Sequence, residues 1–306
     1  MQLISREYGV AVAKRTSDDI RKLDFHRIKN DKSFWVADPF PIEINGELYI
    51  FGEVFEYIKD KGSIGYTKLV NGEFITWKVI IEEDYHMSFP YLFFENDILY
   101  MCPETSQSDQ LYLYRCVEFP EKWKKDKILI NGGNYSDTIF YRKDGAIYGY
   151  TCIWESVDKH EFKIFRVQEN GCEFSNGKIN TLDFYMTRPA GKVLVEKEKN
   201  IMVSQICKPL YGTGLIFKEF NMDWPNYSEK ELYRLYPNEI QCDIKEKYVG
   251  MHTYNLTENY VVIDLIWNRF SLSEKILHLK KKTKKRIPYS TLREENRNGE
   301  CDHKSE

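Results

Sequence analysis

Short stretches of alternating apolar and polar residues run through most of the chain, and many come in pairs around a tight turn. Three pairs share one layout, over residues 37–53, 88–104 and 136–152. Their turns fall at Asn45-Gly46, Asn96-Asp97 and Asp144-Gly145. Such dipeptides between strand-like stretches are a strong signal for a β-hairpin, because these residues accept the left-handed backbone of a two-residue turn. The pattern therefore predicts antiparallel β-structure.

The hairpins repeat along the chain. A tyrosine takes the same place in the second strand of each, at Tyr49, Tyr100 and Tyr148. Weaker copies cover residues 187–205 and 251–264, and further strand-like stretches lie at 62–69, 77–81, 110–116, 125–130, 162–167 and 211–217. Four strands in a unit of about 50 residues are typical of a β-propeller blade.

The fifth repeat ends near residue 270 without a third and a fourth strand. The stretches 8–13 and 23–28 near the N-terminus resemble the missing strands. We therefore predict an all-β fold, a five-bladed β-propeller over residues 1–270 that is closed by pairing of the N- and C-terminal strands. A β-sandwich is the alternative, but the recurrence of the hairpin in one order favours the propeller.

Composition narrows the class of protein. The chain has 306 residues with 22 Tyr and 18 Phe, an aromatic content that excludes a disordered chain. Apolar runs are short, and the run 260–267 carries Asp264, so no membrane span is predicted. The net charge of −3 argues against a nucleic-acid binder.

The chain ends and the cysteines suggest a cytoplasmic location. No secretory signal is recognised at the N-terminus, and seven cysteines without paired spacing indicate free thiols rather than disulfides or a zinc site. No metal or cofactor is predicted. Residues 271–306 form a basic tail, with seven Lys or Arg and no acid in 275–286. We expect a short helix from residue 273, a disordered end from 294, and at most weak contact with an anionic surface.

Propeller geometry indicates where polar chemistry should gather. The first strand of a blade begins at one mouth of the central channel, and the antiparallel second strand ends there. The residues at these starts are Asp38, His86 with Ser88, Asp137, Arg188 and His252, and those at the ends are Glu53, Glu104, Gln205 and Asp264. All are polar within otherwise apolar repeats, so we expect a functional pocket at this mouth.

Single residues of this set also fit structural roles. Asp38 and Asp137 could cap the strand starts, and Glu53 could pair with Arg188. Paired carboxylates are nevertheless the groups that glycosidic bond chemistry needs, one to protonate the leaving oxygen and one to activate water. Aromatic residues near the mouth could stack on sugar faces, although we expect at least half of them to be core residues: Trp35, Tyr85, Phe89, Tyr135, Trp154 and Tyr254.

At these residues the chain resembles a known family, the N-terminal domain of plant glucosamine inositolphosphorylceramide transferase and its bacterial relatives. The most specific match is His86-Met-Ser-Phe-Pro90 with Tyr100-Met-Cys-Pro-Glu-Thr-Ser106, and the resemblance covers about residues 5 to 270. Further matches are 37–40, 48–53, 62–65, 113–116, 119–123, 137–138, Arg188-Pro-Ala-Gly191, Tyr211-Gly212 and Gly250-Met-His-Thr-Tyr254. The family implies a setting of polysaccharide synthesis.

The propeller is more distantly similar to that of family 43 glycoside hydrolases. That resemblance implies Asp38 as the base, Glu104 as the general acid and Asp137 as the residue that tunes the acid. The substrate, a glycan or an activated sugar, would contact Glu53, His86, Ser88, Arg188, Gln205, Tyr211 and His252. No phosphate-cradling loop or Asp-x-Asp pair supports a nucleotide-sugar transferase.

Two functions stay open from the sequence. The first is an enzyme that cleaves or transfers a glycosyl group at the channel mouth. The second is a non-catalytic glycan-binding or scaffolding propeller that assists a glycosyltransferase.

Overall fold

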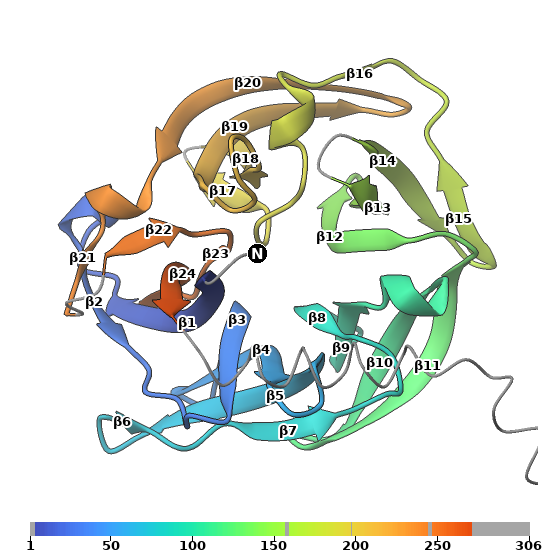
Figure 1. Cartoon of the computed structure of the whole chain (residues 1–306). Coiled ribbons are helices and arrows are strands. Elements are labelled where there is room, and N and C mark those ends of the chain that lie inside the picture. Colours follow the sequence, from blue (N-terminus) through green and yellow to red (C-terminus); the bar gives the residue numbers. More distant parts are fainter. Residues whose placement is uncertain (1–3, 157–158, 197, 244–246, 271–306) are drawn as a thin grey trace, which may run out of the picture. The chain divides into compact units, whose positions relative to one another are not determined.

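The computed structural model describes residues 4–156, 159–196, 198–243 and 247–270 (Figure 1). The expectations for the basic tail 271–306 lie outside this range. The chain divides into two compact units, Glu7–Trp267 and a second that combines Met1–Arg6 with Asn268–Glu306. The larger unit carries the blades and the candidate site.

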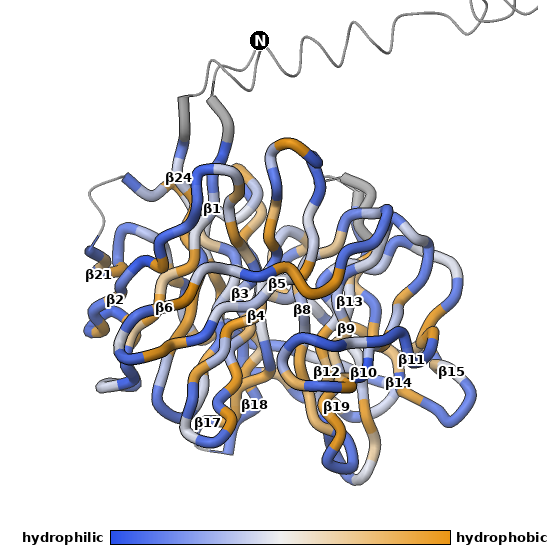
Figure 2. Tube along the Cα trace, turned by 90° about the horizontal axis from the view of Figure 1, so that it is seen from below, coloured by the Kyte–Doolittle hydropathy of each residue, from blue (hydrophilic) through white to orange (hydrophobic). Residues whose placement is uncertain are grey.

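Five mainly antiparallel sheets are arranged around a common centre as five blades (Figure 1). The predicted five-bladed β-propeller is confirmed, and the sandwich alternative is wrong. Hydrophobic and hydrophilic residues alternate along the strands (Figure 2), as expected for sheets that pack face to face. Only short 3₁₀ helices occur among the described residues, at Ile20–Lys22, Ser106–Ser108, Phe184–Met186 and Pro237–Glu239, and none of them has the length to span a membrane.

Four blades follow one another along the chain. Blade 1 contains β3 (Phe34–Ile44), β4 (Glu47–Glu56), β5 (Lys61–Val70), β6 (Glu73–Phe74) and β7 (Lys78–Ile81). Blade 2 contains β8 (Ser88–Glu95), β9 (Ile98–Glu104), β10 (Gln110–Glu118) and β11 (Lys122–Asn131). Blade 3 contains β12 (Tyr135–Lys143), β13 (Ala146–Ser156), β14 (Lys159–Gln168) and β15 (Gly171–Phe174). Blade 4 contains β16 (Ile179–Asn180), β17 (Leu194–Glu196), β18 (Lys199–Ile206), β19 (Gly214–Asp223) and β20 (Asn226–Leu235).

Blade 5 closes the ring with strands from both ends of the chain. It contains β22 (Tyr248–Gly250), β23 (Tyr254–Leu256), β24 (Tyr260–Phe270), β1 (Ile4–Lys14), β2 (Asp24–Arg27) and β21 (Gln241–Cys242). β1 lies between β24 and β2, so the predicted closure is confirmed. β21 adds a parallel partner to β2 that the sequence did not indicate, because a two-residue strand has no readable pattern.

The first strands of blades 1 to 3 share a bulge near their start. The pairing register shifts between Ala37 and Phe40, between Ser88 and Tyr91, and between Ser136 and Ile139. Asp38, Phe89 and Asp137 lie in these bulges with left-handed φ angles of 51°, 46° and 49°. Bulges re-aim side chains, and backbone strain of this kind is common at functional sites. Asp38, Phe89 and Asp137 are therefore equivalent positions at the channel mouth.

Aromatic side chains fill the space between neighbouring blades. Phe40 of blade 1 meets Phe89 of blade 2 edge to face at a centroid distance of 4.8 Å. Tyr49, one of the repeated tyrosines, packs edge to face on Phe119 at 4.7 Å. Aromatic pairs of this geometry add to the free energy gained from burial. The high aromatic content thus follows largely from repeated inter-blade contacts.

Candidate active site at the channel mouth

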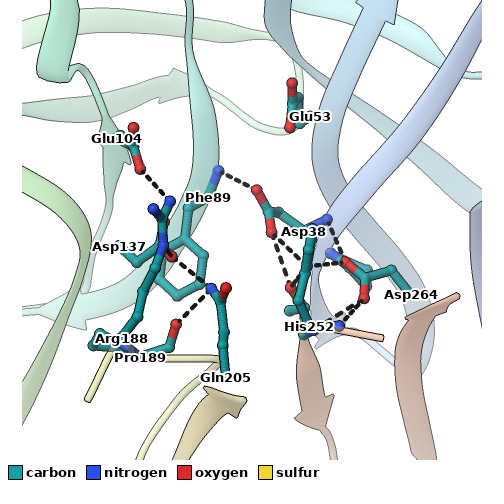
Figure 3. Close-up of polar contacts among 12 residues, drawn as sticks. Asp38, Glu53, Phe89, Glu104, Asp137, Arg188, Pro189, Gln205, His252 and Asp264 are labelled. Atoms are coloured by element: carbon teal, nitrogen blue, oxygen red, sulfur yellow. Dashed lines mark hydrogen bonds and ion pairs between the residues drawn. The ribbon is translucent and has the colours of Figure 1, made fainter. Parts of the chain in front are cut away.

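One cluster at the mouth is organised by a buried arginine (Figure 3). Arg188 donates through Nε and Nη2 to the carboxylate of Asp137 and through Nη2 to Glu104 Oε2 at 3.2 Å. Gln205 Nε2 donates to Asp137 Oδ2 at 2.7 Å. We call Glu104, Asp137, Arg188 and Gln205 the arginine cluster. It joins blades 2, 3 and 4, so the convergence of these four predicted residues is observed.

The arginine cluster holds its charges away from water. All four residues are buried. Burial raises the pKa of Asp137 to about 7, the Arg188 guanidinium acts in the opposite direction, and neighbouring Glu104 adds to the increase. Glu104 accepts a further hydrogen bond from Ser106 Oγ at 2.9 Å. Both carboxylates are therefore fixed in position by donors from the protein.

A second cluster joins blades 5 and 1. Asp264 accepts hydrogen bonds from the backbone N–H groups of His252 and Thr253, both at 2.9 Å, and from that of Asp38 at 3.1 Å. His252 Nδ1 lies 2.7 Å from Asp264 Oδ2. Asp38 accepts from Thr253 Oγ1 at 2.9 Å and from the backbone N–H of Phe89 at 3.1 Å. We call Asp38, His252, Thr253 and Asp264 the aspartate–histidine cluster.

The pKa values of the two aspartates in this cluster shift in opposite directions. Burial raises the pKa of Asp38 to about 6, although His252 acts against this. Burial also opposes the charge on His252, but Asp264 and Asp38 outweigh it and raise the pKa of His252 to about 8. The His252 cation and its hydrogen bonds lower the pKa of Asp264 against the effect of burial. At neutral pH Asp264 and His252 therefore form a buried ion pair.

Asp38, His252 and Asp264 are also the residues best placed to hold a metal ion. Their potential ligand atoms all lie within 4.8 Å of one another. Each carboxylate oxygen accepts a hydrogen bond from the protein and keeps a second lone pair, and His252 could offer Nδ1 to a cation only as the neutral ring. Hydrogen bonds and the Asp264–His252 ion pair account for this arrangement.

Glu53 lies near the end of β4 at the same mouth and contrasts with the other carboxylates. Its side chain is only 7% exposed, and among the described residues its carboxyl group forms no hydrogen bond (Figure 3). The nearest cation candidate is His86, whose Nε2 lies 3.3 Å from Oε1. Burial, together with Asp38 and Glu104, raises the pKa of Glu53 well above its usual range. Arg188 pairs with Glu104 and Asp137, so the alternative pairing with Glu53 is wrong.

His86 faces Glu53 with its ring nitrogen Nε2. The backbone N–H of Gly62 donates to His86 Nδ1 at 3.0 Å, so the proton of the neutral ring is on Nε2. Burial lowers the pKa of His86, which favours this neutral form. A Cβ atom on Gly62 would lie 2.6 Å from Glu53 Oε1, so only glycine at this position leaves room for the Glu53 carboxyl group beside His86. Ser88, the other predicted residue here, is buried and pairs in register with Glu104.

A row of rings borders the two clusters. From Tyr211 the row continues through His252, Tyr8, Trp35 and Phe55 to His86, with successive centroid distances of 5.4, 5.1, 4.7, 4.6 and 6.2 Å. Tyr8, Trp35, Phe55 and Tyr211 remain partly exposed. We call these six residues the aromatic row. Aromatic faces beside carboxylates are suited to stacking on a sugar ring.

The sequence identified part of this row. Trp35 was expected at the mouth, whereas Phe89, Tyr135 and Tyr254 are buried, as expected for at least half of the candidates. Tyr85 is not in the row, and its Oη lies 3.5 Å from Tyr114 Oη on blade 2. The side chain of Trp154 is not among those that the structure describes. Tyr8 and Phe55 were missed. Phe55 was recognisable, because it follows Glu53 by two residues and so shares its face of β4.

Comparison with known proteins identifies the family of the chain. A family model described as "Glucosamine inositolphosphorylceramide transferase 1, N-terminal" matches residues 25–259. The chain belongs to this family. Glucosamine inositolphosphorylceramide transferase 1 of Arabidopsis thaliana is 35% identical over 114 residues, 36% of this chain and 15% of that protein. Its counterpart in Oryza sativa subsp. japonica is 35% identical over 103 residues, 32% of this chain and 14% of that protein. The match thus spans only about a seventh of these relatives' length.

Two solved structures with the same fold are glycosidases. An α-L-arabinofuranosidase from Podospora anserina superposes with a TM-score of 0.57 and 12% identity, covering 79% of this chain and 93% of that one. A β-xylosidase superposes with a TM-score of 0.54 and 12% identity, covering 78% and 94%. At this identity the likeness shows the fold alone. The family, through its name, connects the chain with carbohydrate-related proteins.

Proposed function

We propose that the protein binds a glycan or an activated sugar at the channel mouth and cleaves or transfers a glycosyl group there. The observation that carries this proposal is the meeting of carboxylates from four blades beside a row of partly exposed aromatic rings. Among them, Asp38 is held by hydrogen-bond donors, whereas Glu53 is buried without any among the described residues. Two carboxyl groups in contrasting environments suit acid and base roles at one sugar.

In the hydrolytic version Asp38 acts as the base. It takes a proton from water while the water oxygen bonds to the anomeric carbon, and the bond to the leaving oxygen breaks as that oxygen receives a proton from a glutamic acid. In the transfer version an acceptor hydroxyl replaces water. Each Asp38 oxygen accepts one hydrogen bond and keeps capacity for a second, so Asp38 can receive the proton. Asp137, Arg188, Gln205, Ser88 and Tyr211 orient the sugar.

A non-catalytic glycan-binding or scaffolding role is the second candidate. The arginine cluster favours it, because Asp137 already accepts from Arg188 and Gln205 and the network is rigid without a substrate. Such a module would present a glycan to a glycosyltransferase.

The cellular setting is part of the same proposal. The six cysteines in the described part of the chain are free thiols, and three of them are buried, which supports a reducing cytoplasmic compartment. Polysaccharide biosynthesis, the setting that the sequence resemblance implies, is the proposed place of the reaction. Contact of the tail 271–306 with an anionic surface stays a prediction.

A binding and turnover screen tests the proposed function. Purified protein is titrated against a glycan library and assayed on glycosides and sugar nucleotides. Trp35→Ala should weaken binding of the best glycan by at least about 10-fold, because Trp35 lies between Tyr8 and Phe55 and its loss interrupts the aromatic row. Phe94→Ala is the matched control, since Phe94 is 53% exposed near the opposite end of β8. Equal effects of both variants contradict the site, and binding without turnover supports the second candidate.

A further inference from the structure

Glu53 and Glu104 form a matched pair with opposite surroundings. Each lies near the mouth end of the second strand of its blade, and each is buried. Glu104 accepts hydrogen bonds from the Arg188 cation and from Ser106. Glu53 Oε1 is buried with no hydrogen bond among the described residues. The resemblance assigns proton donation to Glu104, but the contacts suit Glu104 as an acceptor and Glu53 as a protonated acid.

The groups that face Glu53 favour its neutral form. The carboxyl groups are Asp38 on β3, Glu104 on β9, Asp137 on β12 and Asp264 on β24, and each acts against a further negative charge. His86, in the segment before β8, presents Nε2–H at 3.3 Å from Oε1 as a neutral ring. No described cation pairs with Glu53 at neutral pH. Burial and these neighbouring carboxyl groups therefore favour a proton on Glu53.

We propose that Glu53 is the catalytic proton donor, that His86 is a positioning residue for it, and that Glu104 anchors Arg188. This inference rests on the proposed function, since it assigns a role within that reaction. The Glu53 carboxyl proton moves to the glycosidic oxygen as the bond from the anomeric carbon breaks and its electron pair goes to that oxygen. The resulting Glu53 carboxylate accepts a hydrogen bond from His86 Nε2–H. Asp38 holds the proton taken from water, and solvent reprotonates Glu53.

Dependence on the leaving group separates the two glutamates. Wild type, Glu53→Gln and Glu104→Gln are compared on an alkyl glycoside and a 2,4-dinitrophenyl glycoside of the same sugar, chosen from the screen. A dinitrophenolate departs without a proton, so only the alkyl substrate needs the acid. Glu53→Gln should slow the alkyl glycoside by about 10²–10⁴-fold and the dinitrophenyl glycoside by less than about 3-fold. Glu104→Gln should slow both alike.

The pH profile tests the positioning role of His86. His86→Phe removes the donor to the Glu53 carboxylate and should move the alkaline limb of the rate profile to higher pH. His86→Gln keeps one donor and one acceptor and should restore the limb. A merely structural role would change the rate without moving the limb.

Different outcomes overturn the inference and the proposed function. Leaving-group dependence that appears in Glu104→Gln and not in Glu53→Gln overturns the assignment while the function stands. Absence of turnover on every glycoside and sugar nucleotide overturns the enzymatic function. ¹³C NMR of the glutamate carboxyl groups, assigned by the signal missing in Glu53→Gln, then reports on Glu53 without turnover. A Glu53 signal that is ionised at pH 6 contradicts the protonated acid.

Discussion

The Asp38→Asn variant is expected to lose about 10²–10⁴-fold in turnover, the usual contribution of a positioned general base, while its fold becomes more stable. The substitution suits the backbone, because asparagine tolerates the left-handed φ of 51° at this position. The amide oxygen can accept from the Phe89 N–H, and the amide nitrogen can donate to the Thr253 hydroxyl. Both hydrogen bonds of Asp38 are thus replaced, and only the charge is lost.

The gain in stability follows from the raised pKa of Asp38. Its folded pKa is about 6 against an ordinary value of 3.8, so its contribution to stability is fully present below pH 3.8 and is lost as the pH rises through about 6. Asparagine has no such loss. We expect the free energy of unfolding at pH 8 to rise by roughly 1–3 kcal/mol, since one pKa unit corresponds to about 1.4 kcal/mol. The gain should be absent near pH 4.

Urea unfolding at pH 8 and near pH 4 measures the change in stability. Steady-state kinetics measures the loss of turnover. A variant that is less active and also less stable at both pH values would indicate that Asp38 is a structural cap. A variant with unchanged turnover would remove Asp38 from the reaction.

Arg188→Met is expected to lower the free energy of unfolding by about 3–5 kcal/mol, because it leaves buried carboxyl groups without their cation. Methionine has a similar length, so the loss reports on charge rather than on a cavity. Asp137 is in direct contact with the guanidinium, and Gln205 alone cannot compensate for its loss. This loss is large against the total stability of a typical domain, about 5–15 kcal/mol.

A double-mutant cycle with Asp137→Asn isolates the contact. The double variant should recover a large part of the stability that Arg188→Met loses, with a coupling energy of at least about 1 kcal/mol in denaturant unfolding. Lys230→Met, in which an exposed lysine is replaced, is the matched control and should change stability by less than about 0.5 kcal/mol. Additive effects of the two site variants would contradict the ion pair.

The fold was predictable because one hairpin recurs with its turn residues. The positions of Asp38, Glu53, Glu104, Asp137 and Asp264 near the mouth followed from strand direction alone, without knowledge of contacts. In blade 2 the residue equivalent to Asp38 is Phe89 and not Ser88, and the repeat itself shows this, because Phe89 and Asp38 stand at the same distance before the repeated tyrosines Tyr100 and Tyr49.

The partners of the charged residues were not predictable from the sequence. Arg188 could reach several carboxylates, and its choice of Asp137 and Glu104 depends on how three blades face one another. That choice leaves Glu53 without a cation. The aromatic row was not predictable for the same reason, because Tyr8 and Trp35 come from blades 5 and 1 and meet only in the closed ring.

The central claim is that the channel mouth holds the sugar whose glycosidic bond is processed. A crystal structure of the Glu53→Gln variant with the best glycan from the screen tests it most directly. We predict a sugar ring in contact with the aromatic row, with its glycosidic oxygen within hydrogen-bond distance of the side chain at position 53 and its anomeric carbon facing Asp38. A glycan bound elsewhere, such as the groove between blades 5 and 1 lined by Lys14, Lys29 and Phe74, with the mouth empty, would contradict the account.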